Sequence, residues 1–399
     1  MLNKVKLSSI YLHFAVLLFA SCSSKNNDPL DNDPPDKMGE YPKEQMDNDP
    51  SDEMGEYPKG QNVYAFGFEY DTQMYSGAKL WKNGVLRTFS KNVSDIVQTS
   101  DTDGSLLNST VTSIYVSGDD LFVTGFEQLT SVNGPFARAR LWKNGVLQHL
   151  DNRDIGHVAI SVFVSGDDVY VLGYEVIEAT YVANIIVWKN GEAEMIADVK
   201  LQSLSEVVVI SPSRVVNSFF VSDGVVYIVG RSNKQAKLWK NGVVENLDDG
   251  ESAQSVFVSG EDVYVAGYGS SGAKLWKNGN IINLTNAGNN SGAYSVYVSG
   301  SDVYVAGHDG SGAGSASLWK NGIAQDLPDV KDALVFRSVF VKGDDVYVGG
   351  CVQVVQEVEP GSGIIPLVYT NATLWINGKK LRLDIGGENV SELRYVFVN

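Results

Sequence analysis

The sequence predicts an all-β fold built from seven copies of one four-stranded unit, and three observations predict it. Each of the seven tryptophans begins the same short motif, which reads Trp-Lys-Asn-Gly in six copies and Trp-Ile-Asn-Gly in the seventh. A strand-rich run such as "SVFVSGEDVYVAG" precedes the motif in six copies. The two ends of the repeated region carry the two halves of this run for the remaining copy. Repeats of this length are typical of rings and solenoids.

The tryptophan motif marks the second hairpin of each unit. Asn-Gly occupies the two central positions of a tight turn, where both residues need a positive φ. The flanking apolar runs are nearly continuous, which is typical of strands covered on both faces. We therefore interpret the tryptophan as a packing element between units. The seven residues are Trp81, Trp142, Trp188, Trp239, Trp276, Trp319 and Trp375.

The run before the motif predicts the first hairpin, because two β-branched and aromatic segments flank a Gly/Asp turn. It recurs from Ser113, Ser161, Ser218, Ser255, Ser295 and Ser338. Two hairpins give four antiparallel strands per unit and no helix, which is the composition of a β-propeller blade. We label these strands A to D from the axis outward.

The two ends of the repeated region predict how the ring closes. The chain ends in "RYVFVN" (Arg394–Asn399), a first strand without a second, and the region begins with "GQNVYAFGFE" (Gly60–Glu69), a second strand without a first. Joined head to tail they read as one complete first hairpin. One blade is thus expected to take its inner strand from the C-terminus and three outer strands from the N-terminus. The prediction is a seven-bladed β-propeller over residues 62–399.

The N-terminus predicts export and lipidation. Residues 1–21 combine Lys4 and Lys6 with an apolar run too short to span a bilayer, as in a signal peptide. The following "FASC" resembles a bacterial lipobox, although Phe19 stands where leucine is usual. The resemblance implies that Cys22 is lipidated and anchors the chain in a membrane. An ordinary secretory signal with a chance cysteine is the alternative.

Residues 22–61 are expected to form a disordered stalk. Two copies of sixteen residues, 31–46 and 47–62, follow each other and are rich in Asp, Glu, Pro and Lys. Such a composition cannot bury enough apolar surface to offset the entropy of ordering. The alternative is that Tyr41 and Tyr57 form a bivalent recognition motif.

Charge and cysteine content exclude some partners. The formal net charge of −17 opposes binding to nucleic acid and to anionic lipid head groups. Cys351 is the only cysteine besides Cys22, so an internal disulfide is not expected, and we interpret it as a small buried side chain. We expect a monomer that needs no cofactor.

The variable face of the ring is where a site is expected. The A–B and C–D turns fall on one face and are short and monotonous, whereas the B–C and D–A loops fall on the other and vary. The long members are 90–112, 198–217 and 351–371. Loops on a rigid scaffold carry recognition more often than the scaffold does.

Seven residues near the axis of this face form the ligand-binding hypothesis. Each follows the B-strand glycine or enters the A strand, and most break the consensus of the repeat. Aromatic, acidic and arginine side chains that converge on one mouth suit sugars or peptides. The alternative is that the aromatic residues after the glycine pack as core. The candidates are Arg231, Tyr268, Tyr294, His308, Asp309, Arg337 and Arg394.

Motifs for metal binding and catalysis are weak. "DTDGS" (Asp101–Ser105) has part of a calcium loop but lacks the other acids that the loop requires, and the histidines show no zinc spacing. Glu69, Glu127, Glu175 and Asp309 could supply the carboxylate pair of a glycoside hydrolase. A solvated rim explains the same residues. No metal is expected, with calcium as the open possibility.

The Leu-Trp-Lys-Asn-Gly unit resembles the repeats of bacterial lipoprotein propellers over residues 62–399, and the resemblance brings no catalytic motif with it. It implies an outer-membrane lipoprotein of the cell envelope, on the periplasmic side or at the surface. We expect a non-catalytic binding module for a glycan or a protein. The alternatives are a carbohydrate-active enzyme that uses rim carboxylates and a scaffold subunit of an envelope complex.

Overall fold

The computed structural model describes the ring and leaves the N-terminal segment undescribed. The described residues are 57–70, 76–87, 108–131, 134–150, 156–177, 182–200, 215–285, 290–310, 314–355, 368–383 and 390–399. The predicted signal peptide, Cys22, most of the predicted stalk and the calcium-loop motif at Asp101–Ser105 lie outside them. Within the described part, no helix is long and apolar enough to cross a membrane.

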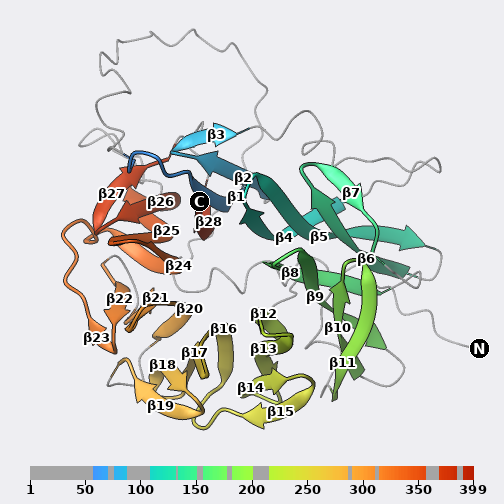
Figure 1. The fold of residues 1–399 in the computed structure, drawn as a ribbon. Coiled ribbons are helices and arrows are strands. Elements are labelled where there is room, and N and C mark those ends of the chain that lie inside the picture. Colours follow the sequence, from blue (N-terminus) through green and yellow to red (C-terminus); the bar gives the residue numbers. More distant parts are fainter. Residues whose placement is uncertain are drawn as a thin grey trace, which may run out of the picture. The chain divides into compact units, whose positions relative to one another are not determined.

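The described residues form seven four-stranded antiparallel sheets around a common axis (Figure 1). Innermost strands of neighbouring sheets contact each other all the way around, including across the closure between β28 and β4. The predicted seven-bladed β-propeller is confirmed. We number the blades one to seven from the blade that begins with β4.

In blades 1 to 6 the strands run outward in chain order. Blade 1 holds β4 (Asn108–Ser117), β5 (Asp120–Ser131), β6 (Gly134–Lys143) and β7 (Val146–Gln148). Blade 2 holds β8 (His157–Ser165), β9 (Asp168–Ile177), β10 (Val182–Lys189) and β11 (Glu192–Lys200). Blade 3 holds β12 (Val216–Ser222), β13 (Val225–Ser232), β14 (Gln235–Lys240) and β15 (Val243–Asn246). Blade 4 holds β16 (Ser252–Ser259), β17 (Asp262–Gly269), β18 (Gly272–Lys277) and β19 (Asn280–Asn283).

The last three blades complete the ring. Blade 5 holds β20 (Gly292–Ser299), β21 (Asp302–His308), β22 (Ala316–Lys320) and β23 (Ile323–Ala324). Blade 6 holds β24 (Ala333–Lys342), β25 (Asp345–Val355), β26 (Val368–Ile376) and β27 (Lys379–Arg382). Blade 7 holds β28 (Val390–Val398), β1 (Val63–Tyr70), β2 (Ser76–Lys82) and β3 (Val85–Arg87).

Blade 7 joins the two ends of the ring, as predicted. Its strand order is β28-β1-β2-β3, and β28 pairs with β1 from Val63 opposite Val398 to Tyr70 opposite Val390. Asn62 and Asn399 extend the ladder, because each donates its backbone N–H to the carbonyl of the other at 2.9 and 3.1 Å. The ring is therefore closed by hydrogen bonds between its own ends.

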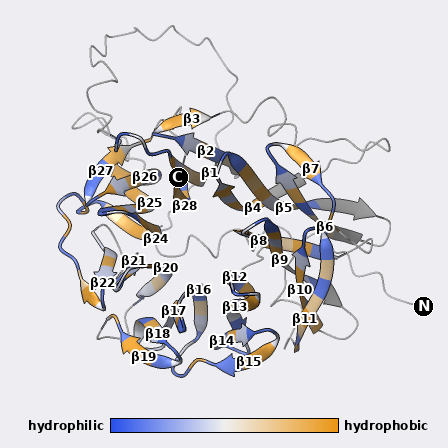
Figure 2. Ribbon diagram, viewed as in Figure 1, coloured by the Kyte–Doolittle hydropathy of each residue, from blue (hydrophilic) through white to orange (hydrophobic). Residues whose placement is uncertain are grey.

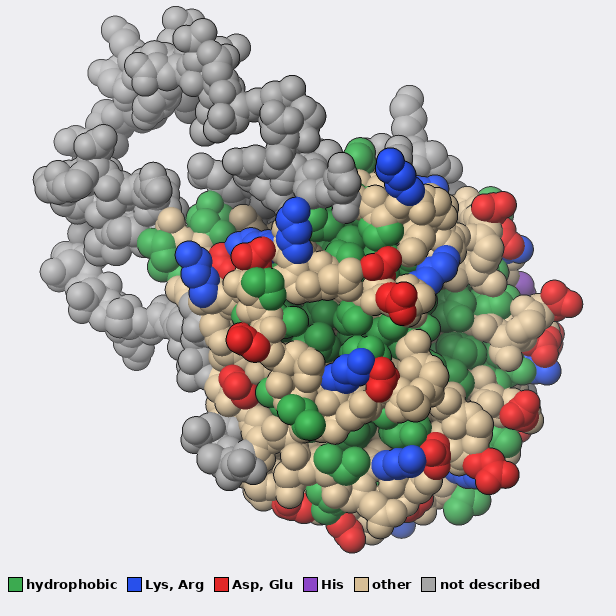
Figure 3. Space-filling model, turned by 60° about the vertical axis from the view of Figure 1, so that its left-hand side comes forward, with side chains coloured by type: hydrophobic (Ala, Val, Ile, Leu, Met, Phe, Trp, Pro, Cys, Tyr) green, Lys and Arg blue, Asp and Glu red, His purple; other side chains and the backbone are tan. Residues whose placement is uncertain are grey.

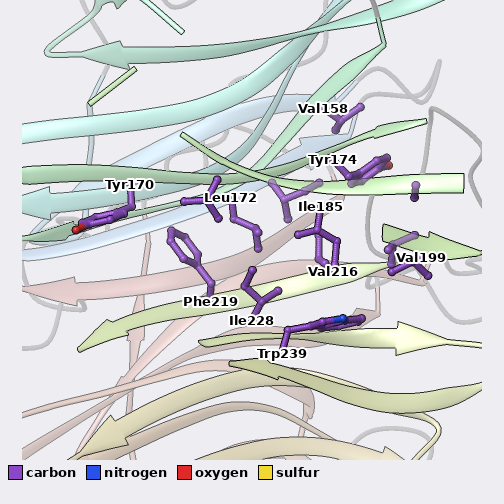
Figure 4. Packing of buried hydrophobic residues seen from close by; sticks show 14 of the residues in the cluster. Val158, Tyr170, Leu172, Tyr174, Ile185, Val199, Val216, Phe219, Ile228 and Trp239 are labelled. Atoms are coloured by element: carbon purple, nitrogen blue, oxygen red, sulfur yellow. The ribbon is translucent and has the colours of Figure 1, made fainter. Parts of the chain in front are cut away.

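The tryptophans pack between blades, which confirms their predicted role. All seven are buried, with at most 5% of the side chain exposed. In one cluster, Leu172 and Ile185 of blade 2 face Ile228 and Trp239 of blade 3 (Figure 4). Each blade thus buries both faces of its sheet, which explains why its apolar runs are continuous.

In each blade, the asparagine of the Asn-Gly turn hydrogen-bonds to the backbone beside the A–B turn and so connects the C–D turn to it. In all seven copies the asparagine has φ between 44° and 53°, and the following glycine is also positive. Asn278 is typical: its Oδ1 accepts the N–H of Val263 at 2.8 Å, and its own N–H donates to the carbonyl of Val263 at 2.9 Å. The A–B and C–D turns therefore lie on one face, as the sequence predicts.

Acids and lysines of the short turns form ion pairs on that same face. Lys277 Nζ lies 2.7 Å from Asp262 and over the ring of Tyr264, and the same arrangement recurs in other blades. On the side of the molecule that Figure 3 turns toward the viewer, acidic and basic side chains are interspersed, and several of them are adjacent. Exposed pairs of this kind contribute little to stability. They support the interpretation as turn chemistry and solubility.

The outermost strands expose aliphatic side chains around the rim. Val146, Val243 and Ile323 are 64%, 74% and 69% exposed on β7, β15 and β23. The same pattern shows as hydrophobic stretches on β3, β7 and β19 in Figure 2. The exposed aliphatic residues are distributed over the outer strands of several blades, so they form several small hydrophobic areas rather than one continuous hydrophobic patch.

Candidate functional site

Every innermost strand contains a β-bulge, and the bulged residue is the one that varies most between blades. The pairing with the second strand skips one residue at the same position in every blade, and in blade 6 it skips Leu334 as well. A bulge redirects side chains and is often found beside a site. The seven bulged residues are Thr112, Ile160, Asn217, Gln254, Tyr294, Arg337 and Arg394.

The bulge explains the glycine that follows the apolar run of each second strand. A Cβ on Gly230 would lie 1.9 Å from the carbonyl oxygen of Val215, and one on Gly307 would lie 2.0 Å from that of Gly292. No side chain fits there without a shift of the backbone. Glycine therefore lets the two strands stay paired where the inner strand bends.

Three residues beyond each bulge, an aromatic side chain contributes to a closed ring around the axis. Neighbouring rings have centroids between 4.8 and 6.4 Å apart, in tilted or edge-to-face arrangements. Such pairs stabilise beyond the area that they bury. We call these residues the aromatic collar; they are Tyr115, Phe163, Phe220, Phe257, Tyr297, Phe340 and Phe397.

Serines between the bulge and the collar join neighbouring blades. Ser255, Ser295 and Ser338 each accept a hydrogen bond from a backbone N–H of the next inner strand, at 3.3, 3.2 and 3.1 Å. The inner strands are thus connected by polar contacts as well as by the collar. The bulged residues and the collar together form what we call the axial surface.

Tyr294 and His308 form the first part of a polar network on the axial surface. The Nδ1 of His308 lies 2.6 Å from the carbonyl oxygen of Gly310, so this nitrogen carries the proton. Nε2 then accepts a hydrogen bond from the hydroxyl of Tyr294 at 3.0 Å. Burial lowers the pKa of His308, and the charge of Arg337 lowers it further, so the imidazole is neutral at pH 7.

Arg337 extends this network across two blade boundaries. Its guanidinium lies over the ring of Tyr294 in blade 5, 4.3 Å from the centroid. Its Nε bonds to Oε1 of Glu392 in blade 7 at 2.6 Å, and Oε2 of Glu392 pairs with Arg394 Nη2 at 3.0 Å. We call Tyr294, His308, Arg337, Glu392 and Arg394 the axial cluster.

Electrostatics keep the cluster charged at neutral pH. Burial raises the pKa of Glu392, but the charges of Arg394 and Arg337 outweigh burial, and the pKa lies below its ordinary value. A carboxyl with a lowered pKa stabilises the folded state above its unfolded pKa, and that contribution is lost as the pH falls below about 4. Burial lowers the pKa of Arg337, but Glu392 outweighs this and raises it overall.

The other predicted site residues lie at different distances from the cluster. Tyr268 is half-buried in blade 4 and interacts electrostatically with Tyr294. Asp309 is exposed, and its negative charge raises the pKa of His308 against the larger lowering by burial. Arg231 is half-buried in blade 3, and no contact among the described residues joins it to Arg337 or Arg394. The structure thus brings Tyr294, His308, Arg337 and Arg394 together.

Several residues that follow the B-strand glycine are core, as in the alternative interpretation. Phe126 and Tyr174 are each 1% exposed. Cys351 is buried, and burial raises the pKa of its thiol to about 12, so the thiol is protonated at neutral pH. Cys351 is therefore a packed side chain, as predicted.

Sequence reasoning missed Glu392 and the aromatic collar. Glu392 occupies a register that is small or apolar in most blades, for example Val158, Ser252 and Gly292. An acid two residues before Arg394 was therefore a visible departure from the repeat. The collar was visible as an aromatic residue at the third position of every "SVFV" segment.

Two of the four acids predicted for hydrolysis are engaged within their own blades. Glu127 forms an ion pair with Arg140 at 2.6 Å, and Glu175 accepts a hydrogen bond from Asn184 at 3.1 Å. The side chain of Glu69 lies outside the described residues. Within the described part of the chain, no group of three His, Cys, Asp or Glu residues could hold a metal ion.

A hollow of about 700 Å³ lies on the variable face of blade 6. Asp332, Tyr369, Asn371 and Lys380 contribute to its lining, and Lys380 pairs with Asp332 at 2.5 Å. A hollow of about 280 Å³ lies on the short-turn face between blades 5 and 6. Neither includes a predicted site residue. We place the candidate site at the axial cluster because polar side chains from three blades meet there.

Comparison with known proteins adds no function. No family model matches the chain, and no curated protein matches it. Among solved structures, the computationally designed Ika8 protein is 14% identical with a TM-score of 0.38, over 68% of this chain and 74% of that chain. An acylaminoacyl peptidase from Pyrococcus horikoshii is 14% identical with a TM-score of 0.35, over 84% and 55%.

A GH43_1 enzyme from Xanthomonas citri, complexed with xylose, is 8% identical with a TM-score of 0.29, over 62% of this chain and 82% of that chain. Scores this low carry no argument about activity.

Proposed function

We propose that this chain is a non-catalytic binding module of the bacterial cell envelope, and that it binds a glycan through the axial surface. The observation that carries the proposal is the axial cluster, in which side chains of three consecutive blades meet. Polar and charged groups fixed in this way by a rigid scaffold are typical of recognition sites.

The aromatic collar supports the same proposal. Its seven rings are partly buried, and they lie on the same inner strands as the bulged residues. Sugars present apolar C–H faces and polar hydroxyls, so they suit a surface where aromatic rings lie beside hydrogen-bonding groups. A variable mouth on an otherwise repetitive ring is consistent with selection for one ligand.

Binding to a glycan array tests the proposal. The chain from Ser23 to Asn399 is expected to bind a restricted set of glycans, and the variant Arg337→Ala/Arg394→Ala is expected to lose that binding. Arg138→Ala is the matched control, because Arg138 is a half-buried arginine on the third strand of blade 1, away from the cluster.

The array separates two classes of partner. Absence of binding by a folded protein would contradict the glycan proposal and favour a protein partner, to be sought by crosslinking in the intact envelope. Binding that survives in the double variant would place the glycan elsewhere, with the hollow on blade 6 as the next surface to examine.

We further propose that Cys22 carries lipid and holds the chain at the outer membrane. The support is the sequence "FASC" after a short apolar run, followed by the duplicated segment of residues 31–62 that would act as a stalk. One acyl chain binds a membrane only marginally, whereas several give firm anchoring.

Replacement of Cys22 by serine tests the anchor. The wild-type chain is expected to incorporate radiolabelled palmitate and to sediment with membranes, and Cys22→Ser is expected to do neither. Cys351→Ser is the matched control because its buried thiol is not accessible to an acyltransferase. Membrane association of Cys22→Ser at the wild-type level would contradict the anchor.

A further inference from the structure

The arginines of the axial cluster outnumber the carboxylate that pairs with them. One carboxylate, Glu392, serves both Arg337 and Arg394. His308 is neutral because burial lowers its pKa, and burial raises the pKa of Tyr294, which keeps its hydroxyl uncharged. Two arginines and one glutamate leave the cluster with a net charge of +1 at neutral pH. This positive charge lies in a chain whose formal net charge is −17.

Arg394 is the arginine best placed to meet a ligand. Its side chain is 38% exposed, against 25% for Arg337 and 15% for Glu392. Its Nε is buried and has no hydrogen-bond partner among the described residues. A guanidinium group offers five N–H donors, and an unsatisfied buried donor is costly. Since Nε is buried, a ligand would meet the exposed remainder of the guanidinium group, where Nη2 pairs with Glu392.

The other charged or titratable groups around the cluster do not supply this acceptor. Asp309 is exposed and acts on His308, and it forms no ion pair with either arginine among the described residues. Cys351 lies close enough to Glu392 to interact electrostatically, but its thiol is protonated. The unmet charge thus stays on the arginines.

We propose that the axial cluster binds an acidic sugar, such as a hexuronate or a sialic acid, with the sugar carboxylate on Arg394. This inference rests on the proposed glycan-binding function and names its ligand class. A guanidinium and a carboxylate are both planar and can form two parallel hydrogen bonds. Glu392 shows that the cluster already holds one carboxylate, by a single contact to each arginine, Oε1 to Arg337 and Oε2 to Arg394.

The collar gives the sugar ring a second contact. Phe397 follows Arg394 by three residues on β28, which places the two positions roughly 10 Å apart along the strand. One or two sugar rings span that length. An acidic sugar bound in this way would place its carboxylate on Arg394 and its C–H faces against the aromatic collar. It would thus contact both the bulged residues and the collar.

Matched pairs of ligands test the inference. Tetragalacturonate carries charged carboxylates that its methyl ester replaces by neutral ester groups, and sialyllactose and lactose differ by the acidic sugar. In calorimetric titration of the chain from Ser23 to Asn399, at least one acidic member is expected to bind. Its neutral partner is expected to bind roughly 10- to 100-fold more weakly, the usual effect of losing hydrogen bonds to a charged group.

The variant Arg394→Gln assigns the preference to one side chain. It is expected to remove most of the difference between acidic and neutral ligands, Arg394→Lys is expected to restore part of it, and Arg138→Gln is expected to leave it unchanged. A melting curve for each variant shows that the fold is kept. Affinity for the acidic ligand should fall as the pH drops below about 4, where the sugar carboxyl becomes protonated.

Each other result overturns the inference in a recognisable way. If the acidic and neutral glycans of a pair bound equally well, the proposed glycan-binding function would stand, but the sugar carboxylate would have no part in recognition. Binding of an acidic peptide with a free C-terminus, without any acidic glycan, would reassign the cluster to a protein ligand. A change in affinity centred below pH 6.5 but above the range where the sugar carboxyl titrates would identify His308, whose pKa is lowered by burial, as the controlling group instead.

Discussion

Deletion of Leu393–Asn399 is expected to abolish the cooperative unfolding transition of the propeller. The deletion removes most of β28, so β1 loses its ladder and becomes the exposed inner edge of blade 7. It also removes Leu393, Val396 and Val398, which are 0%, 2% and 7% exposed. Burial of three such side chains contributes about 5–8 kcal/mol, which is comparable to the whole stability of a domain.

Thermal unfolding followed by circular dichroism measures the effect, and a circular permutant is its control. Joining Asn399 to Gly60 and opening the chain within residues 286–289 keeps every strand but makes blade 7 continuous. The permutant is expected to melt at or above the temperature of the unpermuted chain. If the truncated chain melted at the wild-type temperature, the ends could not be what closes the ring.

Replacement of Trp276 by alanine is expected to cost about 3–5 kcal/mol, the range for a large buried aromatic residue. Trp276 is fully buried between blades 3 and 4, where it packs with Val229, Leu238 and Ala253. Its Nε1 also donates to the carbonyl of Asp248 at 3.0 Å. The variant leaves a cavity between two sheets and an unsatisfied carbonyl.

Urea unfolding gives the change in the free energy of unfolding, provided that the slope with denaturant is unchanged. Trp276→Phe keeps part of the ring and is expected to lose less. Ile281→Ala, in the outermost strand of the same blade, is the control: the side chain is 38% exposed, and the change is expected to stay within about 0.5 kcal/mol. Equal effects at Trp276 and Ile281 would contradict a packing role for the tryptophan.

The fold could be predicted from the sequence because the same physical demands recur seven times. Asparagine with a positive φ, glycine opposite a bulge and tryptophan between sheets each leave a fixed residue at a fixed register. Repetition separates such requirements from chance, since no single copy would be convincing. The shared blade could be predicted for the same reason, because the two fragments complete one another when aligned on the repeat.

The site could be predicted only in part because it consists of departures from the repeat. Arg337 and Arg394 are visible as exceptions, but their meeting at Glu392 depends on how far neighbouring inner strands are offset around the ring. Sequence does not give that offset. Phe126 and Tyr174 were compatible with a rim or with the core, and only the packing of the next blade shows that they are core.

The position of β1 inside blade 7 determines how the ring resists a pulling force on the N-terminal segment. β1 is hydrogen-bonded to β28 on one side and to β2 on the other, and the chain enters it at Val63 from the N-terminal segment. Under the proposed lipid anchor, a pull on the tether acts along β1. Antiparallel hydrogen bonds run perpendicular to the strands, so such a force loads both ladders in shear and all rungs share it. The ring is thus held to its tether at a strand suited to resist tension rather than at an edge that would peel.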